Sequence, residues 1–472
     1  MTHQFDNSWP RDLPGSFLRL APDAAPAPRL LALNQPLAAS LGFDPEALEN
    51  HAADWFSGAS AMPGADPIAL AYAGHQFGGF SPALGDGRAH LLGELITPTG
   101  QRLDLQLKGS GRTPFSRGGD GKAALGPMLR EYLISEAMHA LGVPTTRALA
   151  VTATGEDIWR DSGRSPGAVL ARIAASHIRV GSFQFFSARG EVDKLQALTA
   201  YTIARHFPEA TTALEMFDAV AARQSRLIAQ WMGLGFIHGV MNTDNMALSG
   251  ETIDYGPCAF MEAYAPGTVF SSIDRQGRYA WANQPVILGW NLARLAEALI
   301  PLIDPDGEKA VEIANDRLGQ IAHRYQADWL AVMRDKLALS GEDPADEALI
   351  EDLLTALQGA DWTLAFHRLA SATTGDTSLL KPLFQDFTAM EAWLPRWHAR
   401  LAPDATATLR KTNPAVIPRN HNVEEALEAA TNGNMTPFHA LLQAITHPYN
   451  AAEPFMLPAP SSFGPYKTFC GT

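Results

Sequence analysis

Cysteine is scarce in this sequence: Cys258 and Cys470 are its two cysteines among 472 residues. That is too few for a disulfide-stapled secreted scaffold, and it fits a reducing compartment. The N-terminal MTHQFDNSWPRDLPG carries acids and an early proline and has no apolar run, unlike a secretory signal or a transit peptide. We therefore expect a cytoplasmic protein.

Positive charge and long apolar runs are also lacking. Lysine and arginine number 36 against 50 aspartates and glutamates, so the formal net charge is −14. This balance argues against non-specific binding to nucleic acid or to an acidic membrane surface. No run of about 18 apolar residues occurs, so we expect no membrane span. The hydrophobic content of 46% is ordinary for a globular protein.

Several familiar catalytic motifs are missing as well. The sequence has no GxxxxGK[ST] phosphate loop, no HExxH and no cysteine cluster with zinc-site spacing. The string GRSPG (163–167) lies in the predicted turn DSGRSPG, so no GxSxG nucleophile elbow of a serine hydrolase follows a strand. These absences argue against a P-loop NTPase, a zinc enzyme and a Ser-His-Asp hydrolase.

The first part of the chain is rich in glycine and in strand-like patterns. HLLGEL (90–95) has β character, and RLDLQLK (102–108) alternates leucine with polar residues, which predicts a half-buried strand with Lys108 at the end of its polar face. Apolar spacing over 125–141 predicts a helix, and residues 148–172 read as two further strands.

The remainder of the chain reads as mainly helical. The helical patterns cover 192–235, 286–303, 308–337, 346–358 and 423–433. The Ala/Pro-rich segment 21–30 and the Pro-rich tail 453–472 are expected to lie extended on the surface. A strand-rich part followed by a helix-rich part, with a boundary near 175–190, is typical of a two-lobed fold that encloses a nucleotide.

HGVMNTDNMALSGETIDYG (238–256) has the spacing of a protein-kinase catalytic loop and metal-binding segment. His238, Asn245 and Asp254 occupy the expected positions, but Val240 stands where a kinase has its catalytic Asp. Oxygen ligands from Asn245 and Asp254 suit Mg²⁺, although both could be ordinary turn residues. The neighbouring Asp244 is either a displaced base or a turn cap.

Cationic residues near the glycines complete the candidate site. Lys108 could pair with Glu131 or Glu136 of the predicted helix, as in kinases, or it could be a solvated strand lysine. Two Gly-rich loops, 73–88 and 109–122, could bring backbone close to phosphate or could simply be flexible. Their charged residues are Arg88, Arg112, Arg117 and Asp120.

Two further arginines, Arg172 and Arg179, are seven residues apart. If this segment is helical, they share one face and could clamp a phosphate; otherwise they are surface arginines.

Four long blocks resemble the selenoprotein O (YdiU-type) family of protein adenylyltransferases. They are YAGHQFGGFSPALGDGRAHLLGE (72–94), DLQLKGSGRTPFSRGGDGKAAL (104–125), REYLISEAMHALGVPTTRAL (130–149) and HGVMNTDNMALSGETIDYGPCAFME (238–262). The resemblance, which extends over essentially the whole chain, implies an α+β, bilobal protein-kinase-like fold with ATP bound in an inverted orientation. It also implies transfer of AMP to a Ser, Thr or Tyr hydroxyl of a protein, with release of diphosphate.

The resemblance assigns roles to particular residues. Asp244 matches the proton acceptor, and Asn245 and Asp254 match ligands of Mg²⁺ or Mn²⁺. The positions that match nucleotide contacts are Gly85, Gly87 and Arg88 in the phosphate loop, Lys108 with its helix partner Glu131, Asp120 and Gly121 in the second Gly-rich loop, and Arg172 and Arg179 at the inverted γ-phosphate. The metal ligand Asp254 also belongs with the nucleotide contacts.

The same resemblance suggests a division of the chain and a redox element. We expect an N-terminal extension (1–65), a nucleotide-binding N-lobe (66–180), a helical C-lobe (181–450) and a tail (451–472) that carries Cys470. Redox control in the family uses a C-terminal Cys or selenocysteine with a Cys in the activation segment, where Phe270 stands in this sequence. A Cys258–Cys470 bridge is a hypothesis here.

Three alternative functions stay open at this point. A protein uridylyltransferase would use UTP with Mn²⁺. A small-molecule phosphotransferase of kinase type would need an Asp where Val240 stands. A non-catalytic nucleotide-binding scaffold would have little need for both Asn245 and Asp254. The acceptors are expected to be proteins, with redox-homeostasis proteins suggested by the resemblance alone.

Overall fold

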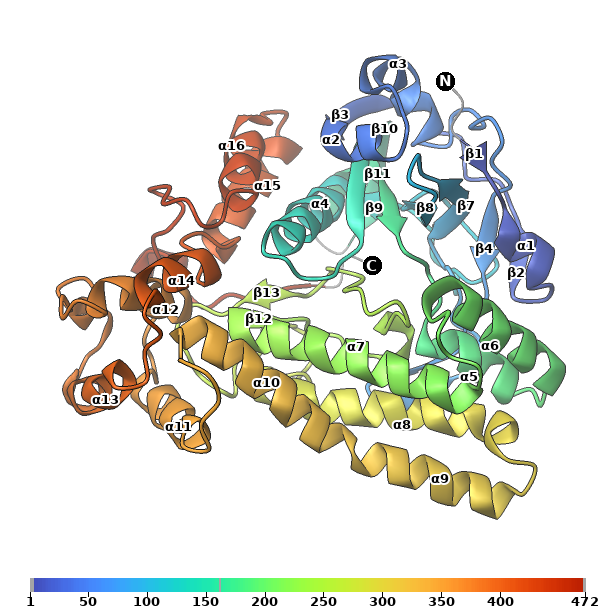
Figure 1. Ribbon diagram of the computed structural model, residues 1–472. Helices are drawn as coiled ribbons and strands as arrows, with labels where there is room; N and C mark the ends of the chain where they lie inside the picture. Colours follow the sequence, from blue (N-terminus) through green and yellow to red (C-terminus); the bar gives the residue numbers. More distant parts are fainter. Residues whose placement is uncertain (1–3, 161–162, 470–472) are drawn as a thin grey trace.

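The computed structural model describes residues 4–160 and 163–469 and shows a mixed α and β protein (Figure 1). An antiparallel sheet is built from strands in the first 174 residues, and the following residues are mainly helical. In Figure 1 the sheet lies above the long green and yellow helices, and the orange and red helices extend to one side. This arrangement places the end of the sheet next to the first segments of the helical part.

The sheet has the strand order β2-β4-β7-β8-β11-β10-β3, with β1 added beside β7 and β9 beside β11. Segments β7 and β8 confirm the two strands predicted at 90–95 and 102–108, and β10 and β11 confirm those at 148–172. The bounds are β1 Gln4–Phe5, β2 Phe17–Arg19, β3 Arg29–Leu33, β4 Ile68–Leu70, β7 Ala89–Ile96, β8 Arg102–Lys108, β9 Ala123–Ala124, β10 Arg147–Arg160 and β11 Gly163–Ala174.

Strand β8 is buried on both faces, so the prediction of a half-buried strand was wrong. Its leucines Leu105 and Leu107 pack in a core with helices α2 (Gln35–Ser40) and α3 (Pro45–Trp55). Its polar face is also inaccessible, because its side chains bond to buried partners rather than to water. The carboxylate of Asp104 is hydrogen-bonded to the ring of His177 and accepts from the guanidinium of Arg205. The Oε1 of Gln106 accepts from the guanidinium of Arg172.

Helix α4 (Leu125–Ala140) confirms the helix predicted over 125–141 and runs against β10 and β11. The position of this helix shows which of its two glutamates, Glu131 or Glu136, pairs with Lys108. Glu131 points to Lys108, whereas Glu136 is bonded by Arg147 and Asn34. Only Glu131 therefore joins the strand lysine to the helix.

Six helices follow the sheet. They are α5 Val180–Ser187, α6 Val192–His206, α7 Ala213–Leu234, α8 Gln284–Ile303, α9 Gly307–Gly319 and α10 Ile321–Leu337. The long α7 packs against α8 and α10. It begins with a capping box between Thr212 and Glu215 and ends at Gly235, whose φ of 71° suits glycine. The single helical stretch predicted over 308–337 is two helices that meet at Gln320.

One helical segment, 281–303, is long and apolar enough by length and composition to cross a membrane, with a mean hydropathy of 1.5. It contains α8, which packs against α5, α7 and α9. The amide of Asn291 on α8 donates to the carbonyl of Met241 at 3.0 Å. These contacts are those of a core helix.

The C-terminal third consists of shorter helices, most of which the sequence patterns did not predict. The bounds are α11 Asp346–Ala356, α12 Trp362–Ala372, α13 Thr388–His398, α14 Ala405–Thr412, α15 Asn420–Thr431 and α16 Thr436–Ile445. Helices α15 and α16 pack back on α4. The tail then returns to the centre of the molecule, where Thr468 exchanges backbone hydrogen bonds with Phe270 and Ser272.

Candidate active site

A cavity of about 750 Å³ lies between the sheet and the helical part. Its walls come from the two Gly-rich loops, the ends of β8 and β11, and the segment 240–257. Every residue that the family resemblance matches to a proton acceptor, metal ligand or nucleotide contact lines this cavity except Glu131, which is buried behind Lys108. The predicted residues on the wall are Gly85, Gly87, Arg88, Lys108, Asp120, Gly121, Arg172, Arg179, Asp244, Asn245 and Asp254.

Lys108 and Arg172 form a buried ionic cluster with Glu131 and Asp254. The Nζ of Lys108 lies 2.6 Å from Glu131 Oε2 and 2.5 Å from Asp254 Oδ1. The Nη1 of Arg172 lies 3.1 Å from Glu131 Oε1 and 2.8 Å from the same Asp254 oxygen. Strands β8 and β11 are neighbours with Gln106 opposite Arg172, which is why both cations reach one carboxylate.

Arg179 is the third buried cation of this cluster. The segment is not helical, so Arg172 and Arg179 do not share a helix face: Arg172 is on β11 and Arg179 immediately precedes α5. Arg179 nevertheless reaches the cavity. Its guanidinium lies 4.4 Å from the ring centre of Tyr72, and its Nη1 donates to the carbonyl of Asp244 at 3.0 Å. Among the described residues its buried Nη2 has no hydrogen-bond partner, the nearest acid being Asp86 at 3.9 Å.

Asp254 is held in an unusual state by these neighbours. Burial alone would raise the pKa of its carboxyl, but Lys108, Arg172 and Arg179 together hold that pKa well below the ordinary value. Its backbone has φ of 65°, which a non-glycine residue adopts only where the surroundings enforce it. The site thus keeps one carboxylate ionised and fixed in place.

Asp244 and Asn245 lie in a short 3₁₀ turn, Thr243–Asn245, on the cavity wall. The Oδ1 of Asp244 is buried and has no hydrogen-bond partner among the described residues. Burial raises the pKa of this carboxyl to about 6. A carboxylate on the cavity wall with a raised proton affinity is suited to accept a proton from a bound group.

The residues present fit a divalent cation. Asn245 donates from Nδ2 to the carbonyl of Val240 at 3.1 Å, which leaves its Oδ1 as the coordinating atom. Asp254 uses Oδ1 for Lys108 and Arg172, so Oδ2 is the oxygen left for a metal. Two protein oxygens match the way Mg²⁺ binds, with water and substrate phosphates as its other ligands. The described residues hold no group of three or more His, Cys, Asp or Glu arranged for metal binding.

The two Gly-rich loops close over each other at the top of the cavity. Thr113 donates to the carbonyl of Asp86 at 2.6 Å, and Ser116 donates to that of Gly87. Glycine is required at two positions: Gly85 has φ of 61° with the Phe115 ring against it, and Gly121 has φ of 69°, where a Cβ would lie 2.1 Å from the carbonyl oxygen of Gly111. Backbone therefore packs too closely there for any side chain.

Asp120 is tied to the sheet rather than projecting freely. Its carboxylate receives both terminal nitrogens of Arg160 at 2.8 and 3.0 Å, and it accepts from the amide of Lys122. Arg88 and Arg117 lie on the wall as predicted, whereas Arg112 does not line the cavity. Histidine 238 is structural: its Nε2 lies 2.9 Å from the carbonyl oxygen of Ile253, and its ring stacks on Trp231.

Sequence reasoning missed several residues of the cavity wall. Tyr72, Gln76, Asp86, Asn242 and Arg160 all line it. Asp86 stands between two predicted glycines, and Gln76 lies inside the first Gly-rich loop, so their position in those motifs was the available signal. Burial raises the pKa of Asp86, against the opposing effect of Arg179.

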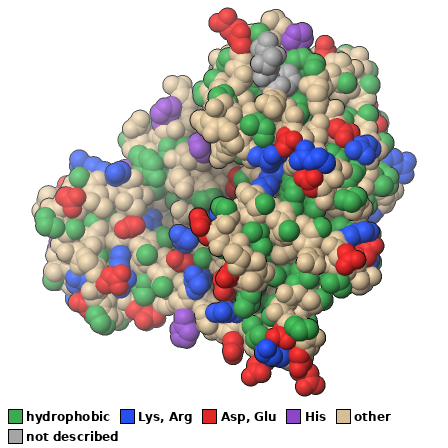
Figure 2. All heavy atoms as spheres, turned by 45° about the vertical axis from the view of Figure 1, so that its right-hand side comes forward, with side chains coloured by type: hydrophobic (Ala, Val, Ile, Leu, Met, Phe, Trp, Pro, Cys, Tyr) green, Lys and Arg blue, Asp and Glu red, His purple; other side chains and the backbone are tan. Residues whose placement is uncertain are grey.

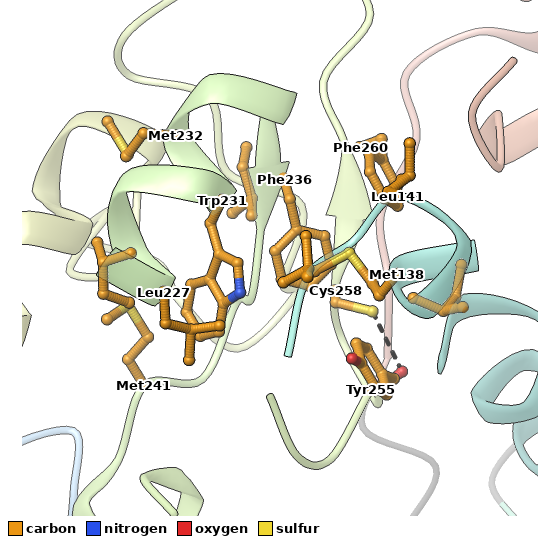
Figure 3. Packing of buried hydrophobic residues seen from close by; sticks show 14 of the residues in the cluster. Met138, Leu141, Leu227, Trp231, Met232, Phe236, Met241, Tyr255, Cys258 and Phe260 are labelled. Carbon is orange, nitrogen blue, oxygen red and sulfur yellow. Dashed lines mark hydrogen bonds between the residues drawn. The ribbon is translucent and has the colours of Figure 1, made fainter. Parts of the chain in front are cut away.

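Cys258 packs inside the hydrophobic core near Phe236 and Met138 (Figure 3). Its thiol donates to the carbonyl of Tyr255 at 3.4 Å, and burial raises its pKa to about 12. A thiol in this state is unreactive while the core is closed. Cys470 lies outside the described residues, so the proposed Cys258–Cys470 bridge stays a prediction. The tail does come close, since Thr468 donates to the carbonyl of Pro257 at 2.6 Å.

Comparison with known proteins decides the family. Residues 2–446 match the sequence family described as "Protein adenylyltransferase SelO". The chain belongs to the SelO family. A protein of Cereibacter sphaeroides strain KD131, named "Protein nucleotidyltransferase YdiU", is 61% identical over the full length of both chains. Proteins of that name from Rhizobium meliloti strain 1021 and Pseudarthrobacter chlorophenolicus are 53% and 54% identical; they cover 99% and 95% of this chain, and 99% and 94% of their own lengths.

Membership in the SelO family makes this chain an enzyme of the nucleotidyltransferase class. It also confirms the family resemblance recognised in the four sequence blocks. Those blocks supply nearly all of the cavity wall: 72–94 and 104–125 give the Gly-rich loops and β8, and 238–262 gives the Asp244, Asn245 and Asp254 segment. This cavity is therefore the candidate site for the nucleotidyltransferase chemistry.

Proposed function

We propose that this protein transfers AMP from ATP to Ser, Thr or Tyr hydroxyls of acceptor proteins and releases diphosphate. The observation that carries the proposal is the surplus of positive charge on the cavity wall, where the described residues include seven Lys and Arg side chains against four Asp. The buried Lys108, Arg172 and Arg179 face the carboxylates of Glu131, Asp254 and Asp86, and one guanidinium nitrogen of Arg179 has no hydrogen-bond partner among the described residues. Such a surplus is stable where a polyanion completes it.

The depth of these cations favours an inverted nucleotide. All three side chains are nearly inaccessible, at 8% exposure or less, so they lie at the closed end of the cavity. A triphosphate that enters with its γ-phosphate first would pair that end with Arg172 and Arg179. Its α-phosphate would then lie beside Asp244. The Gly-rich loops, with Gly85, Gly87, Arg88, Asp120 and Gly121, would cover the rest of the nucleotide.

Asn245 and Asp254 would hold Mg²⁺ or Mn²⁺ against the phosphates. The ion, when bound, would neutralise charge that develops on the phosphate oxygens. The role of the chain is to fix Asp254 as an ionised ligand, which the low pKa produced by its three cationic neighbours supports.

Asp244 would take the proton of the attacking hydroxyl. The hydroxyl oxygen forms a new bond to the α-phosphorus, and the bond from that phosphorus to the bridging oxygen of the leaving diphosphate breaks. The hydroxyl proton passes to the carboxylate of Asp244, which lies on the cavity wall. Positioning and charge neutralisation dominate reactions of this kind, so the apolar Val240 is compatible with catalysis.

The same contacts support a bilobal, protein-kinase-like arrangement. A strand lysine paired to a helical glutamate, Lys108 with Glu131, faces a loop that carries the Asn245 and Asp254 pair, as in kinases. In this proposal the sheet with α4 is the N-lobe, and α5 onward is the C-lobe. A cytoplasmic location and acceptors among redox-homeostasis proteins complete the proposal.

Mass spectrometry of acceptor proteins tests the proposed transfer. The enzyme is incubated with ATP, a divalent cation and a mixture of cytoplasmic proteins, and modified peptides are mapped. A nucleotide monophosphate on Ser, Thr or Tyr supports the proposal, with AMP expected over UMP when both triphosphates are present. A bare phosphate on the acceptor, or modification of small molecules alone, would show that the α-phosphate assignment is wrong.

A further inference from the structure

A small hairpin from the sheet side of the molecule lies directly on the turn that carries Asp244. The hairpin consists of β5 (Gly74–Gln76) and β6 (Gly79–Ser81), which pair with each other and not with the main sheet. Three consecutive hairpin residues contact three consecutive residues of the segment 242–244. This register joins the first Gly-rich loop to the candidate proton acceptor.

Two of the three contacts are backbone amides of the hairpin. The amide of His75 donates to the hydroxyl of Thr243 at 2.7 Å, and the amide of Phe77 donates to Asn242 Oδ1 at 3.1 Å. Thr243 is fully buried, and its hydroxyl donates a hydrogen bond to Gln184 Oε1 at 2.7 Å. These bonds fix the backbone before and after Thr243 and leave the Asp244 side chain to be placed separately.

Gln76 makes the third contact, to the side chain of Asp244. Its Nε2 lies 3.4 Å from Asp244 Oδ2, and its Oε1 lies 3.5 Å from Nη1 of Arg117 in the second Gly-rich loop. Hydrogen bonds to catalytic groups are often long before substrate binds and shorten in the complex. Gln76 thus lies between Arg117 of the second Gly-rich loop and the carboxylate of Asp244.

The hairpin turn is strained in a way that serves these contacts. Phe77 and Gly78 both have positive φ, 50° and 85°. A two-residue turn of this shape prefers Asn-Gly, and a bulky aromatic in the left-handed region is an outlier. The Phe77 ring packs edge-on against Tyr279, whose hydroxyl donates to the same Asn242 oxygen at 2.5 Å. The strain is held by surrounding contacts, as at positions where geometry matters.

We propose that Gln76 is a positioning residue that orients the Asp244 carboxylate so that Oδ2 faces the attacking hydroxyl, and that the β5–β6 hairpin is the clamp that holds it there. The inference rests on the proposed role of Asp244 as proton acceptor. The Oδ1 of Asp244 is buried against Gly74, so Oδ2, which Gln76 bonds, is the oxygen left to face the cavity.

Steady-state kinetics on three variants test this inference. Gln76→Leu removes the amide at similar volume, and Thr243→Val removes the buried hydroxyl without touching the cavity wall. Both are expected to lower kcat by about ten-fold or more, with KM for the nucleotide little changed, because misplacement costs the transition state rather than binding. Gln101→Leu, at an exposed turn, is the control and is expected to match the wild type.

The outcomes separate this inference from the proposed function. Unchanged kcat in Gln76→Leu overturns the inference, as does a higher KM with unchanged kcat, since Gln76 would then contact the nucleotide alone. If the wild type transfers neither AMP nor UMP, the proposed function fails. In that case, amide hydrogen exchange at residues 242–245 still tests whether the hairpin holds this segment. Faster exchange in Thr243→Val than in Gln101→Leu supports the inference, and equal exchange in the two variants overturns it.

Discussion

At the scale of single residues, the site depends on Asp254. Its carboxylate touches two cations and lies 4.0 Å from a third, and its backbone is held at positive φ. A buried acid in that position serves two purposes, as a counter-charge for the cations and as an oxygen ligand. The proposed function requires Asp254 to be a metal ligand, and a substitution can separate this role from that of a counter-charge.

We predict that Asp254→Asn loses transfer by about 100-fold or more, because a neutral amide is a poor ligand for a divalent cation and leaves the phosphates less neutralised. The isosteric amide keeps the shape of the side chain. The measurement is the initial rate of nucleotide transfer over a range of Mg²⁺ and Mn²⁺ concentrations.

Asp352→Asn is the matched control for this substitution. Asp352 lies on α11, is 55% exposed and pairs with Arg396 far from the cavity. Its neutralisation is expected to leave the rate unchanged, since exposed ion pairs contribute little. Full activity in Asp254→Asn would refute the metal assignment.

The spacing of His238, Asn245 and Asp254 was enough to predict which oxygens meet at the cavity. It could not predict the surroundings of Arg179, because the Tyr72 ring and Asp86 come from other segments brought there by the fold. Nor could it separate Glu131 from Glu136, since that choice depends on how α4 lies across β8 and β10.

At the scale of elements, the Gly-rich loops are shaped by close backbone packing. Gly118 and Gly121 lie three residues apart in the same loop, and both have positive φ, 89° and 69°. They differ in their surroundings. A Cβ on Gly118 would meet nothing within 4 Å, whereas one on Gly121 would strike the backbone of Gly111 and Arg112.

This pair gives a matched test of the loop. We predict that Gly121→Ala raises KM for the nucleotide by about ten-fold, because the loop must move away from Gly111, while Gly118→Ala changes it by about two-fold or less. Both variants carry similar backbone strain, of about 1 kcal/mol. Nucleotide titrations of the two proteins provide the comparison, and equal KM values would show that the loop backbone does not contact the nucleotide.

Element prediction succeeded where periodicity was long and regular, as for β7, β8 and α4. It failed for α12, α13, α14 and α16, which are short, at 8 to 11 residues each. Strand β8 shows a different limit. Its leucines alternate with Asp104, Gln106 and Lys108. The same sequence pattern is expected whether the polar face of the strand meets water or is buried against charged partners.

At the scale of the whole molecule, both signs of charge occur on the face shown in Figure 2, where acidic and basic side chains of the described residues lie interspersed. Inside the molecule, and outside the cavity, one lysine is buried without an acidic partner among the described residues. Lys336 of α10 is 5% exposed, donates to Asn413 Oδ1 at 2.8 Å and lies over the Phe366 ring.

Burial lowers the pKa of Lys336 from its ordinary value of 10.5 to about 7. Between pH 7 and 10.5 the unfolded chain binds a proton that the folded chain does not, so this residue makes stability rise with pH in that window. We predict that Lys336→Met removes this contribution, which amounts to at most about 1.4 kcal/mol per pH unit. Urea unfolding at pH 7 and pH 9 measures it; an identical pH slope in both proteins would contradict the burial effect.

The central claim is that the α-phosphate, and not the γ-phosphate, is transferred. It is tested most directly by paired assays with ATP labelled at either position, in the presence of Mg²⁺ or Mn²⁺ and an acceptor protein. The account predicts that the α-label appears in protein while the γ-label leaves in diphosphate, and that Asp254→Asn abolishes both signals. Label in protein from the γ-phosphate alone would contradict it.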